Sequence, residues 1–163
     1  MLRDVVAALE EAAARGERVV LATVVRVVGS SYGGVGARML ARVDGTTVGL
    51  VSGGCLESDL AEHARRVHAT GRAEVVAYDT RADDDAVWGL GLGCNGAIDV
   101  LLAPLDPAGA RATAALLGAA LGGEAPAVLA TVVRADDPAH VGACALLDDA
   151  SPDGEDAPHA VGA

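Results

Sequence analysis

Hydrophobic residues along this 163-residue chain recur with a helical period in three segments. Apolar positions spaced three and four apart cover residues 3–15 and are followed by Gly16, so a helix is predicted there. A second helix is predicted before Gly71, and its apolar face consists of Leu56, Leu60, Ala64 and Val67. An Ala-rich segment predicts a third helix over residues 108–121.

Runs of β-branched and aliphatic residues between these helices predict strands. The first run covers residues 18–28, and two later runs cover residues 73–80 and 97–105. Residues 37–43 and 46–51 flank an Asp-Gly turn, which predicts a β-hairpin. The expected fold is therefore mixed α+β, with a hairpin-rich sheet and flanking helices.

One apolar segment occurs twice. Residues 20–26, Val-Leu-Ala-Thr-Val-Val-Arg, recur as residues 128–134, and each copy follows an apolar helix. The Val-Gly-Ala of residues 35–37 also recurs as residues 141–143. Chance similarity between Ala- and Val-rich strands is the alternative, but identities in register favour a weak internal helix–strand–strand repeat. The second copy lacks the Gly-Gly-Cys sequence that follows the first hairpin.

Charge and hydropathy narrow the classes of function. The formal net charge is −11, from 23 acidic and 12 basic residues, and the chain has no basic block, which disfavours nucleic-acid binding. The longest apolar runs are shorter than a bilayer span, and the N-terminus lacks the pattern of a signal peptide, so a cytoplasmic protein without a membrane span is expected. Three cysteines in such a chain predict reduced thiols rather than a disulfide framework.

The last part of the chain differs in composition from the rest. Residues 148–163 are acidic and rich in Pro and Gly, which predicts a linker or solvated tail. We expect residues 1–147 to form the folded domain. Within it, residues 1–105 carry the motifs described below, and residues 106–147 form the second helix–strand–strand unit.

The sequence Ser52-Gly53-Gly54-Cys55 is the first candidate for chemistry, because it lies where a predicted strand meets a predicted helix. A helix start presents unpaired N–H groups, and glycines before it let an anion approach. The helix dipole also favours a thiolate at this place. Glu57 lies in the first turn, where acids are favoured electrostatically, and could also move protons beside a thiol. The alternative is a tight turn with Cys55 buried as a small hydrophobe.

The second candidate is Cys94, in the predicted irregular connection over residues 81–96. The glycines around it are Gly89, Gly91, Gly93 and Gly96. Such a backbone is suited to close approach by another group. The pattern matches neither a P-loop nor a dinucleotide fingerprint, and the chain has no Cys-x-x-Cys pair. Cys144 lies in an apolar run and is assigned to packing. His63 and His68, five residues apart, are predicted to be surface histidines.

Three motifs in this order and spacing resemble the XdhC/CoxI family. They are Gly29-Ser30-Ser31-Tyr32 with Gly36-Ala37-Arg38-Met39-Leu40, then Ser52-Gly53-Gly54-Cys55-Leu56-Glu57, then Trp88-Gly89-Leu90-Gly91-Leu92-Gly93-Cys94. The resemblance covers residues 1–105 and, more loosely, the second unit. It implies a maturation protein that binds molybdenum cofactor and helps its sulfuration and insertion into a molybdenum hydroxylase of the xanthine or carbon monoxide dehydrogenase type. Many members carry a C-terminal Rossmann-like domain, which is expected to be absent from this chain.

The resemblance also implies a site. Molybdenum cofactor (molybdopterin) is expected to bind transiently to Ser52, Gly53, Gly54, Cys55, Glu57, Gly93, Cys94, Asn95 and Gly96. Cys55 and Cys94 are the candidate molybdenum ligands, since soft thiolates suit this metal, and the pterin phosphate suits the amides of residues 53–55. No catalytic residue is expected of a cofactor chaperone. The chain departs from the family at Asn95, where glycine is usual, and at Gly33 and Gly34, where basic residues are common.

The implied partners are the apo form of a molybdenum hydroxylase, a separate Rossmann-domain subunit, a sulfurtransferase and further copies of this chain in a homo-oligomer. Two other functions stay open. One is a thiol enzyme with Cys55 as nucleophile and Glu57 or His63 as base. The other is a protein-docking module without a small-molecule ligand. If both thiols serve one site, Cys55 and Cys94 should approach each other in the fold or across a dimer interface.

Overall fold

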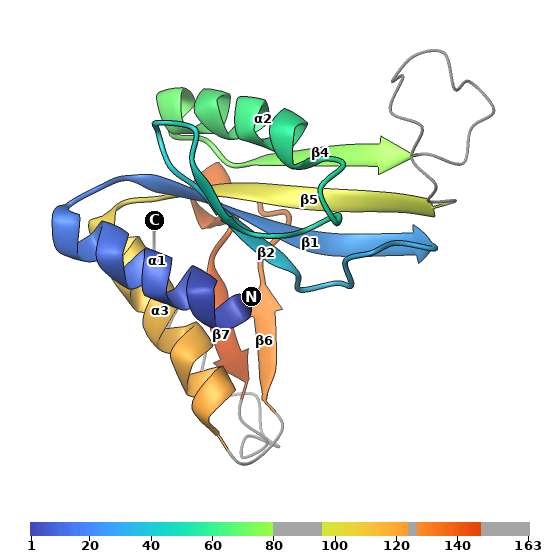
Figure 1. Cartoon of the computed structure of the whole chain (residues 1–163). Coiled ribbons are helices and arrows are strands. Elements are labelled where there is room, and N and C mark those ends of the chain that lie inside the picture. The colour runs from blue at the N-terminus through green and yellow to red at the C-terminus, as the bar shows by residue number, and fades with distance from the viewer. Residues whose placement is uncertain (80–95, 124–126, 148–163) are drawn as a thin grey trace.

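The computed structural model describes residues 1–79, 96–123 and 127–147 (Figure 1). Within these residues, the α-helices are α1 (Leu2–Arg15), α2 (Glu57–Thr70) and α3 (Pro107–Gly122). The strands of an antiparallel sheet, in spatial order, are β3 (Thr47–Gly49), β2 (Arg38–Ala41), β1 (Val19–Gly29), β5 (Gly96–Leu105) and β4 (Glu74–Asp79). A separate hairpin consists of β6 (Val128–Thr131) and β7 (Cys144–Leu147), with the short 3-10 helix η1 (Pro138–His140) between its strands.

This architecture confirms the expected mixed α+β fold. Each predicted helix and strand is present, with ends shifted by a few residues. The two predicted terminators, Gly16 and Gly71, adopt left-handed conformations with φ of 69° and 66° that end α1 and α2. The predicted irregular connection lies outside the described residues, except for Gly96, which begins β5.

Helices cover both faces of the five-stranded sheet, with α2 on one side and α1 and α3 on the other (Figure 1). Side chains of β1 alternate between the two faces because successive residues of a strand point in opposite directions. Val20, Ala22 and Val24 pack with the apolar side of α2. Val19 and Leu21 pack in a second cluster with apolar residues of α1 and α3. The β1–β5 pair at the centre is the longest, running from Val19–Leu105 to Gly29–Gly96.

The internal repeat is present in the structure as two similar hairpins. In the first unit, Val20 pairs with Ala41 and Thr23 with Arg38. In the second unit, the positions that correspond in the sequence pair in the same register.

In the second unit, Val128 pairs with Leu147 and Thr131 pairs with Cys144. Each hairpin also follows a helix, α1 in the first unit and α3 in the second, and these two helices are in contact. The two helix–strand–strand units are therefore alike in strand pairing as well as in sequence.

Main-chain hydrogen bonds beyond the paired strands repeat as well. The amide of Val24 donates to the carbonyl of Ala37 at 2.9 Å, and the amide of Val132 donates to that of Ala143 at 2.9 Å. Gly36 donates back to Val24 at 2.8 Å, and its counterpart Gly142 donates back to Val132 at 2.8 Å. The two glycines have positive φ values of 89° and 97°. The shared Val-Gly-Ala sequence thus encodes the same turn in both units.

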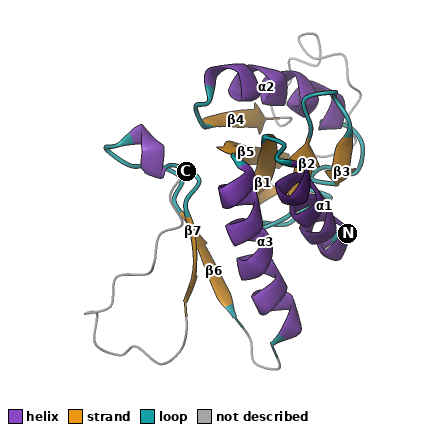
Figure 2. Ribbon diagram, turned by 90° about the vertical axis from the view of Figure 1, so that its left-hand side faces the viewer, coloured by secondary structure: helices purple, strands orange, loops and turns teal. Residues whose placement is uncertain are grey.

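The two units differ in their surroundings. The first hairpin lies within the five-stranded sheet, whereas the second remains two-stranded. Figure 2 shows β6 and β7 beside α3 and outside the larger sheet. As a result Val20 is buried, at 1% exposure, while its counterpart Val128 is 61% exposed.

Candidate functional site

Glycine-rich segments from separate parts of the chain meet at the end of β1. Gly29, the last residue of β1, pairs with Gly96, the first residue of β5. A Cβ atom at Gly96 would overlap with the carbonyl oxygen of Ser30, and one at Gly33 would overlap with that of Val51. The Gly-Ser-Ser-Tyr-Gly-Gly segment therefore contacts both the start of β5 and the segment that leads to Cys55. Such backbone-to-backbone contact requires glycine at these positions.

The loop before α2 presents its thiol to solvent. Gly53 and Gly54 have φ values of 83° and 107°, which favour glycine. A Cβ at Gly53 would lie 3.1 Å from Cγ of Tyr32, whereas one at Gly54 would meet nothing within 4 Å. Cys55 is exposed, so the alternative that it is buried as a small hydrophobe is wrong. The loop is thus an open turn whose backbone and thiol can be approached from outside.

Glu57 binds the loop from its own side. Its Oε1 accepts hydrogen bonds from the amides of Val51 at 3.1 Å and Ser52 at 2.9 Å. Its Oε2 accepts from the hydroxyl of Ser52 at 2.7 Å and the amide of Leu56 at 3.2 Å. The Leu56 amide also donates to the Ser52 hydroxyl oxygen at 2.9 Å. One side chain therefore ties both ends of the loop to the start of α2.

The ionisation of Glu57 follows from these contacts. Partial burial raises the pKa of its carboxyl group, but the hydrogen bonds from Ser52 and Val51 lower it by more, so the pKa lies below its ordinary value. Glu57 is therefore a carboxylate at neutral pH. Within the described part of the chain, the amides of Gly53, Gly54 and Cys55 donate no hydrogen bond. These three amides are the loop's available donors.

A polar cluster links α2 to β4. The hydroxyl of Tyr78 donates to Oδ2 of Asp59 at 2.6 Å. His63 lies between two acids, with Nε2 at 3.5 Å from Asp59 and Nδ1 at 3.1 Å from Glu74. Its side chain is 19% exposed, so this predicted surface histidine is partly covered and paired with acids. In the described residues, no hydrogen bond joins Cys55 to Glu57 or His63, so neither is positioned there as a base for this thiol.

The third cysteine is assigned to packing, as the sequence suggested. Cys144 is half-buried at the start of β7. Its Sγ lies 3.4 Å from Oγ1 of Thr131 and donates to the carbonyl of Gly142 at 3.4 Å. These contacts join the two strands of the β6–β7 hairpin, so Cys144 is a suitable control for the other thiols.

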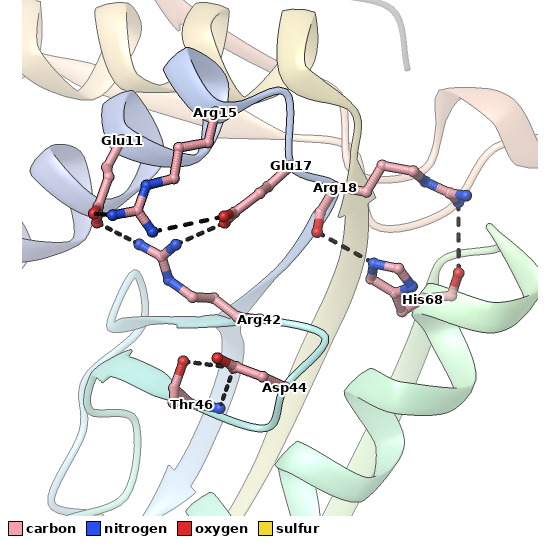
Figure 3. Close-up of polar contacts among 8 residues, drawn as sticks. All are labelled: Glu11, Arg15, Glu17, Arg18, Arg42, Asp44, Thr46 and His68. Atoms are coloured by element: carbon pink, nitrogen blue, oxygen red, sulfur yellow. Dashed lines mark hydrogen bonds and ion pairs between the residues drawn. The ribbon is translucent and has the colours of Figure 1, made fainter.

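A cleft of about 620 Å³ lies at the opposite end of β1, next to the start of that strand (Figure 3). The Arg42 side chain, 13% exposed, bridges Glu11 at 2.6 Å and Glu17 at 2.7 Å. Nearby, His68 Nε2 lies 3.2 Å from the carbonyl oxygen of Arg18. The Arg42 contacts join α1 to the β2–β3 hairpin. We therefore assign this charge network to structure.

Metal clusters and membrane spans are both absent from the described residues. No group of three His, Cys, Asp or Glu residues in the described part is arranged to hold a metal ion. None of its helices is long and apolar enough to cross a membrane.

Several of the expected site residues lie together. Ser52, Gly53, Gly54, Cys55 and Glu57 form the loop described above, and Gly96 reaches it through the segment after β1. Gly93, Cys94 and Asn95 lie outside the described residues, so the expected approach of Cys55 and Cys94 stays a prediction.

Two features of the loop were not predicted from the sequence: the contact between Tyr32 and Gly53, and the hydrogen bonds that Ser52 makes to Glu57 and Leu56. Ser52 and Glu57 are five residues apart, whereas a capping box needs a spacing of three, so no local pattern indicated this pair. For Tyr32, the signal was its position in a glycine-rich segment of a chain with few aromatic residues.

Comparison with known proteins shows which proteins this α+β unit and its glycine-rich loops resemble. Residues 12–79 match the XdhC and CoxI family. This match agrees with the resemblance that the motifs indicated.

Individual relatives agree with the family. A probable xanthine dehydrogenase subunit of Bacillus subtilis (strain 168) is 44% identical over 84 residues, which are 52% of this chain and 26% of that protein. The molybdenum cofactor insertion chaperone PaoD of Escherichia coli (strain K12) is 34% identical over 98 residues, which are 60% of this chain and 30% of that protein. The chain thus spans about a third or less of each curated relative.

A solved structure supports the fold. The crystal structure of a xanthine dehydrogenase from Bacillus halodurans matches with a TM-score of 0.67 and 36% identity. The match covers 88% of this chain and 42% of that one. Because it covers so much of this chain, it extends beyond the segment that matches the family.

Proposed function

We propose that this protein is a maturation factor that binds molybdenum cofactor as cargo and helps its sulfuration and insertion into a molybdenum hydroxylase of the xanthine or carbon monoxide dehydrogenase type. The family match and the chaperone relative support a role in molybdenum-enzyme maturation. The observation that carries the proposal is the exposed Cys55 on an open glycine loop. The apo-hydroxylase is the proposed partner, and the cytoplasm, where thiols stay reduced, is the proposed location.

The chemistry of the loop fits such a cargo. A thiolate is a soft ligand that suits molybdenum–sulfur centres. Gly54 leaves its side of the backbone open, since nothing lies within 4 Å of a Cβ built there. The amides of Gly53, Gly54 and Cys55 are available to hold polar atoms of the ligand. Cys94, two residues before Gly96 in the sequence, is the proposed second thiol, and residues 93–96 are proposed to complete the site.

The proposal needs no catalytic base on this chain. A cofactor chaperone binds, protects and releases its cargo, so an exposed thiol is sufficient even though the described residues place no base beside it. A thiol enzyme would require a base within hydrogen-bond reach of the sulfur. We therefore rank the chaperone above the thiol enzyme, and we propose residues 1–147 as the unit that carries the site.

Binding of isolated molybdenum cofactor tests this function. The full chain would be incubated anaerobically with the cofactor and passed over a desalting column, and co-eluting molybdenum and pterin would be measured. We expect retention by the wild type, reduced retention in Cys55→Ser and Cys94→Ser, and unchanged retention in Cys144→Ser. Absence of retention by the wild type would overturn cofactor binding and favour the docking module. Full retention by both Cys55→Ser and Cys94→Ser would show that the thiols are not ligands.

A transfer assay tests the second half of the proposal. Cofactor-loaded protein would be mixed with an apo molybdenum hydroxylase, and the appearance of hydroxylase activity would be followed over time. We expect faster activation than with free cofactor at the same concentration. Equal rates would mean that the protein binds the cofactor without delivering it.

A further inference from the structure

We propose that Glu57 is an internal anion that positions the Gly53–Cys55 loop. Its carboxylate lies at the start of α2 and accepts hydrogen bonds from residues on both sides of the loop. The inference rests on the proposed function only for the identity of the cargo that the loop binds. The position of the carboxylate itself follows from contacts within the chain.

The carboxylate of Glu57 has its acceptor capacity filled. A carboxylate offers about four lone-pair sites. Each oxygen of Glu57 accepts two hydrogen bonds, from groups on Val51, Ser52 and Leu56. All three of these residues are buried, with exposures of 6% or less. Their polar groups would be costly to leave without partners. Glu57 therefore acts on the cargo through the loop rather than by touching it.

These bonds fix the shape of the loop. They join residues on both sides of Gly53, Gly54 and Cys55, so that the three residues project from a closed base. The hydroxyl of Ser52 donates to Glu57 and accepts from the Leu56 amide, which closes this base from the inside. The open face of the loop, with its thiol and its available amides, is thus organised before any ligand arrives.

The charge of Glu57 also selects the part of the cargo that the loop receives. A helix start usually attracts phosphate, and the sequence suggested this for the pterin phosphate. Here the Glu57 carboxylate already lies at the base of the loop, bonded to Val51, Ser52 and Leu56, and its negative charge repels a second anion nearby. The loop is therefore suited to the metal–sulfur end of a cargo that Cys55 can ligate, and the phosphate must be held by other residues.

Amide hydrogen exchange in the cofactor-free full chain tests the positioning directly. We expect the amides of Val51, Ser52 and Leu56 to exchange about 10- to 100-fold faster in Glu57→Ala than in the wild type, as for lost hydrogen bonds to a charged group. Amides between β1 and β5 should keep their protection, which checks the fold. Glu62→Ala is the control, because Glu62 lies on the exposed side of α2 and pairs with Arg65. Unchanged exchange in Glu57→Ala would overturn the inference.

Chemical rescue adds a readout that general destabilisation would not change. Formate can replace the carboxylate removed in Glu57→Ala, whereas sodium chloride at equal ionic strength cannot. We expect formate to restore both the protection of the three amides and cofactor retention in this variant. Loss of retention that formate does not restore would overturn the inference, because Glu57 would then contact the cargo directly or act through the fold as a whole.

Phosphate titration tests the charge argument. We expect millimolar inorganic phosphate to leave the amide resonances of Gly53, Gly54 and Cys55 unshifted in the wild type, and to shift them in Glu57→Ala. Phosphate binding at this loop in the wild type would overturn the inference. These outcomes are separate from those of the proposed function. If the wild type retains no cofactor but the exchange and formate results hold for the amides, the proposed function fails and the positioning by Glu57 stands.

Discussion

Val24 and Val132 make the same main-chain hydrogen bonds in the two helix–strand–strand units, at 2.9 Å to an alanine carbonyl and 2.8 Å from a glycine amide. Val24 is fully buried, whereas Val132 is 37% exposed. Local sequence therefore specifies the hairpin and its turn, while the neighbouring elements determine burial. The strand β5 and the helix α2 supply that burial in the first unit alone.

This difference gives a prediction about stability at matched positions. Val20→Ala removes methyl groups from the core under α2 and should lower the free energy of unfolding by about 2 kcal/mol. Val128→Ala, at the corresponding position of the second unit, should change it by less than about 0.5 kcal/mol. Urea unfolding monitored by circular dichroism measures both. Equal losses would mean that the face of β6 is covered in solution.

The contact between two glycine-rich segments predicts opposite outcomes at neighbouring residues. Gly33→Ala places a methyl group against the carbonyl of Val51, so we expect a loss of about 1–3 kcal/mol and weaker cofactor retention. Gly34→Ala is the control, because nothing lies within 4 Å of its Cβ and its φ is not positive. Thermal melting and cofactor retention check both variants. A tolerated Gly33→Ala would show that the two segments do not pack closely.

The Tyr78–Asp59 hydrogen bond predicts a loss of stability at alkaline pH. Burial first, and then the bond to Asp59, raise the pKa of the Tyr78 hydroxyl well above its ordinary value of about 10. The folded state thus keeps a proton that the unfolded state loses. The stabilisation is present below about pH 10 and is lost as the pH rises towards the folded-state pKa.

Variants identify the group responsible. Tyr78→Phe should be less stable than the wild type at neutral pH and should lose less stability between pH 9 and 11, a range of about one unit on each side of the ordinary value. Tyr32→Phe, at a tyrosine that is 81% exposed, should follow the wild-type profile. Denaturant unfolding across this range measures the effect. An unchanged profile in Tyr78→Phe would assign the alkaline loss to another group.

Much of the fold was predictable because its signals are local. Helix ends at Gly16 and Gly71 follow from glycine in a left-handed conformation, and the repeated Val-Gly-Ala sequence forms the same turn twice. The sequence also located the loop of residues 52–57. These features depend on periodicity and on backbone preferences within a few residues.

Other features required the three-dimensional arrangement. The exposure of Cys55 could not be read from spacing, since a cysteine after two glycines fits both a buried turn and an open loop. The position of His63 between Asp59 and Glu74 depends on how β4 docks beside α2. The saturation of Glu57 depends on the fold of the loop back onto the helix. In each case the deciding partners come from packing rather than from periodicity.

The conformation of Gly54 gives the last prediction, which separates backbone strain from steric overlap. Its φ is 107°, and nothing lies within 4 Å of a Cβ built on it. Gly54→Ala therefore meets no neighbour but forces alanine into a region that residues with a side chain rarely adopt. We expect a loss of about 1–3 kcal/mol or a rearranged loop, and in either case reduced cofactor retention.

Gly118→Ala is the matched control for Gly54→Ala. Gly118 lies inside α3, also with nothing within 4 Å of its Cβ and with no positive φ. The same substitution there should stabilise the protein by about 0.5–1 kcal/mol, because alanine is the better helix former. Thermal melting measures both effects, and desalting measures retention. If Gly54→Ala melts and retains cofactor like the wild type, the open turn is not the conformation in solution, and the ligand does not need the backbone there.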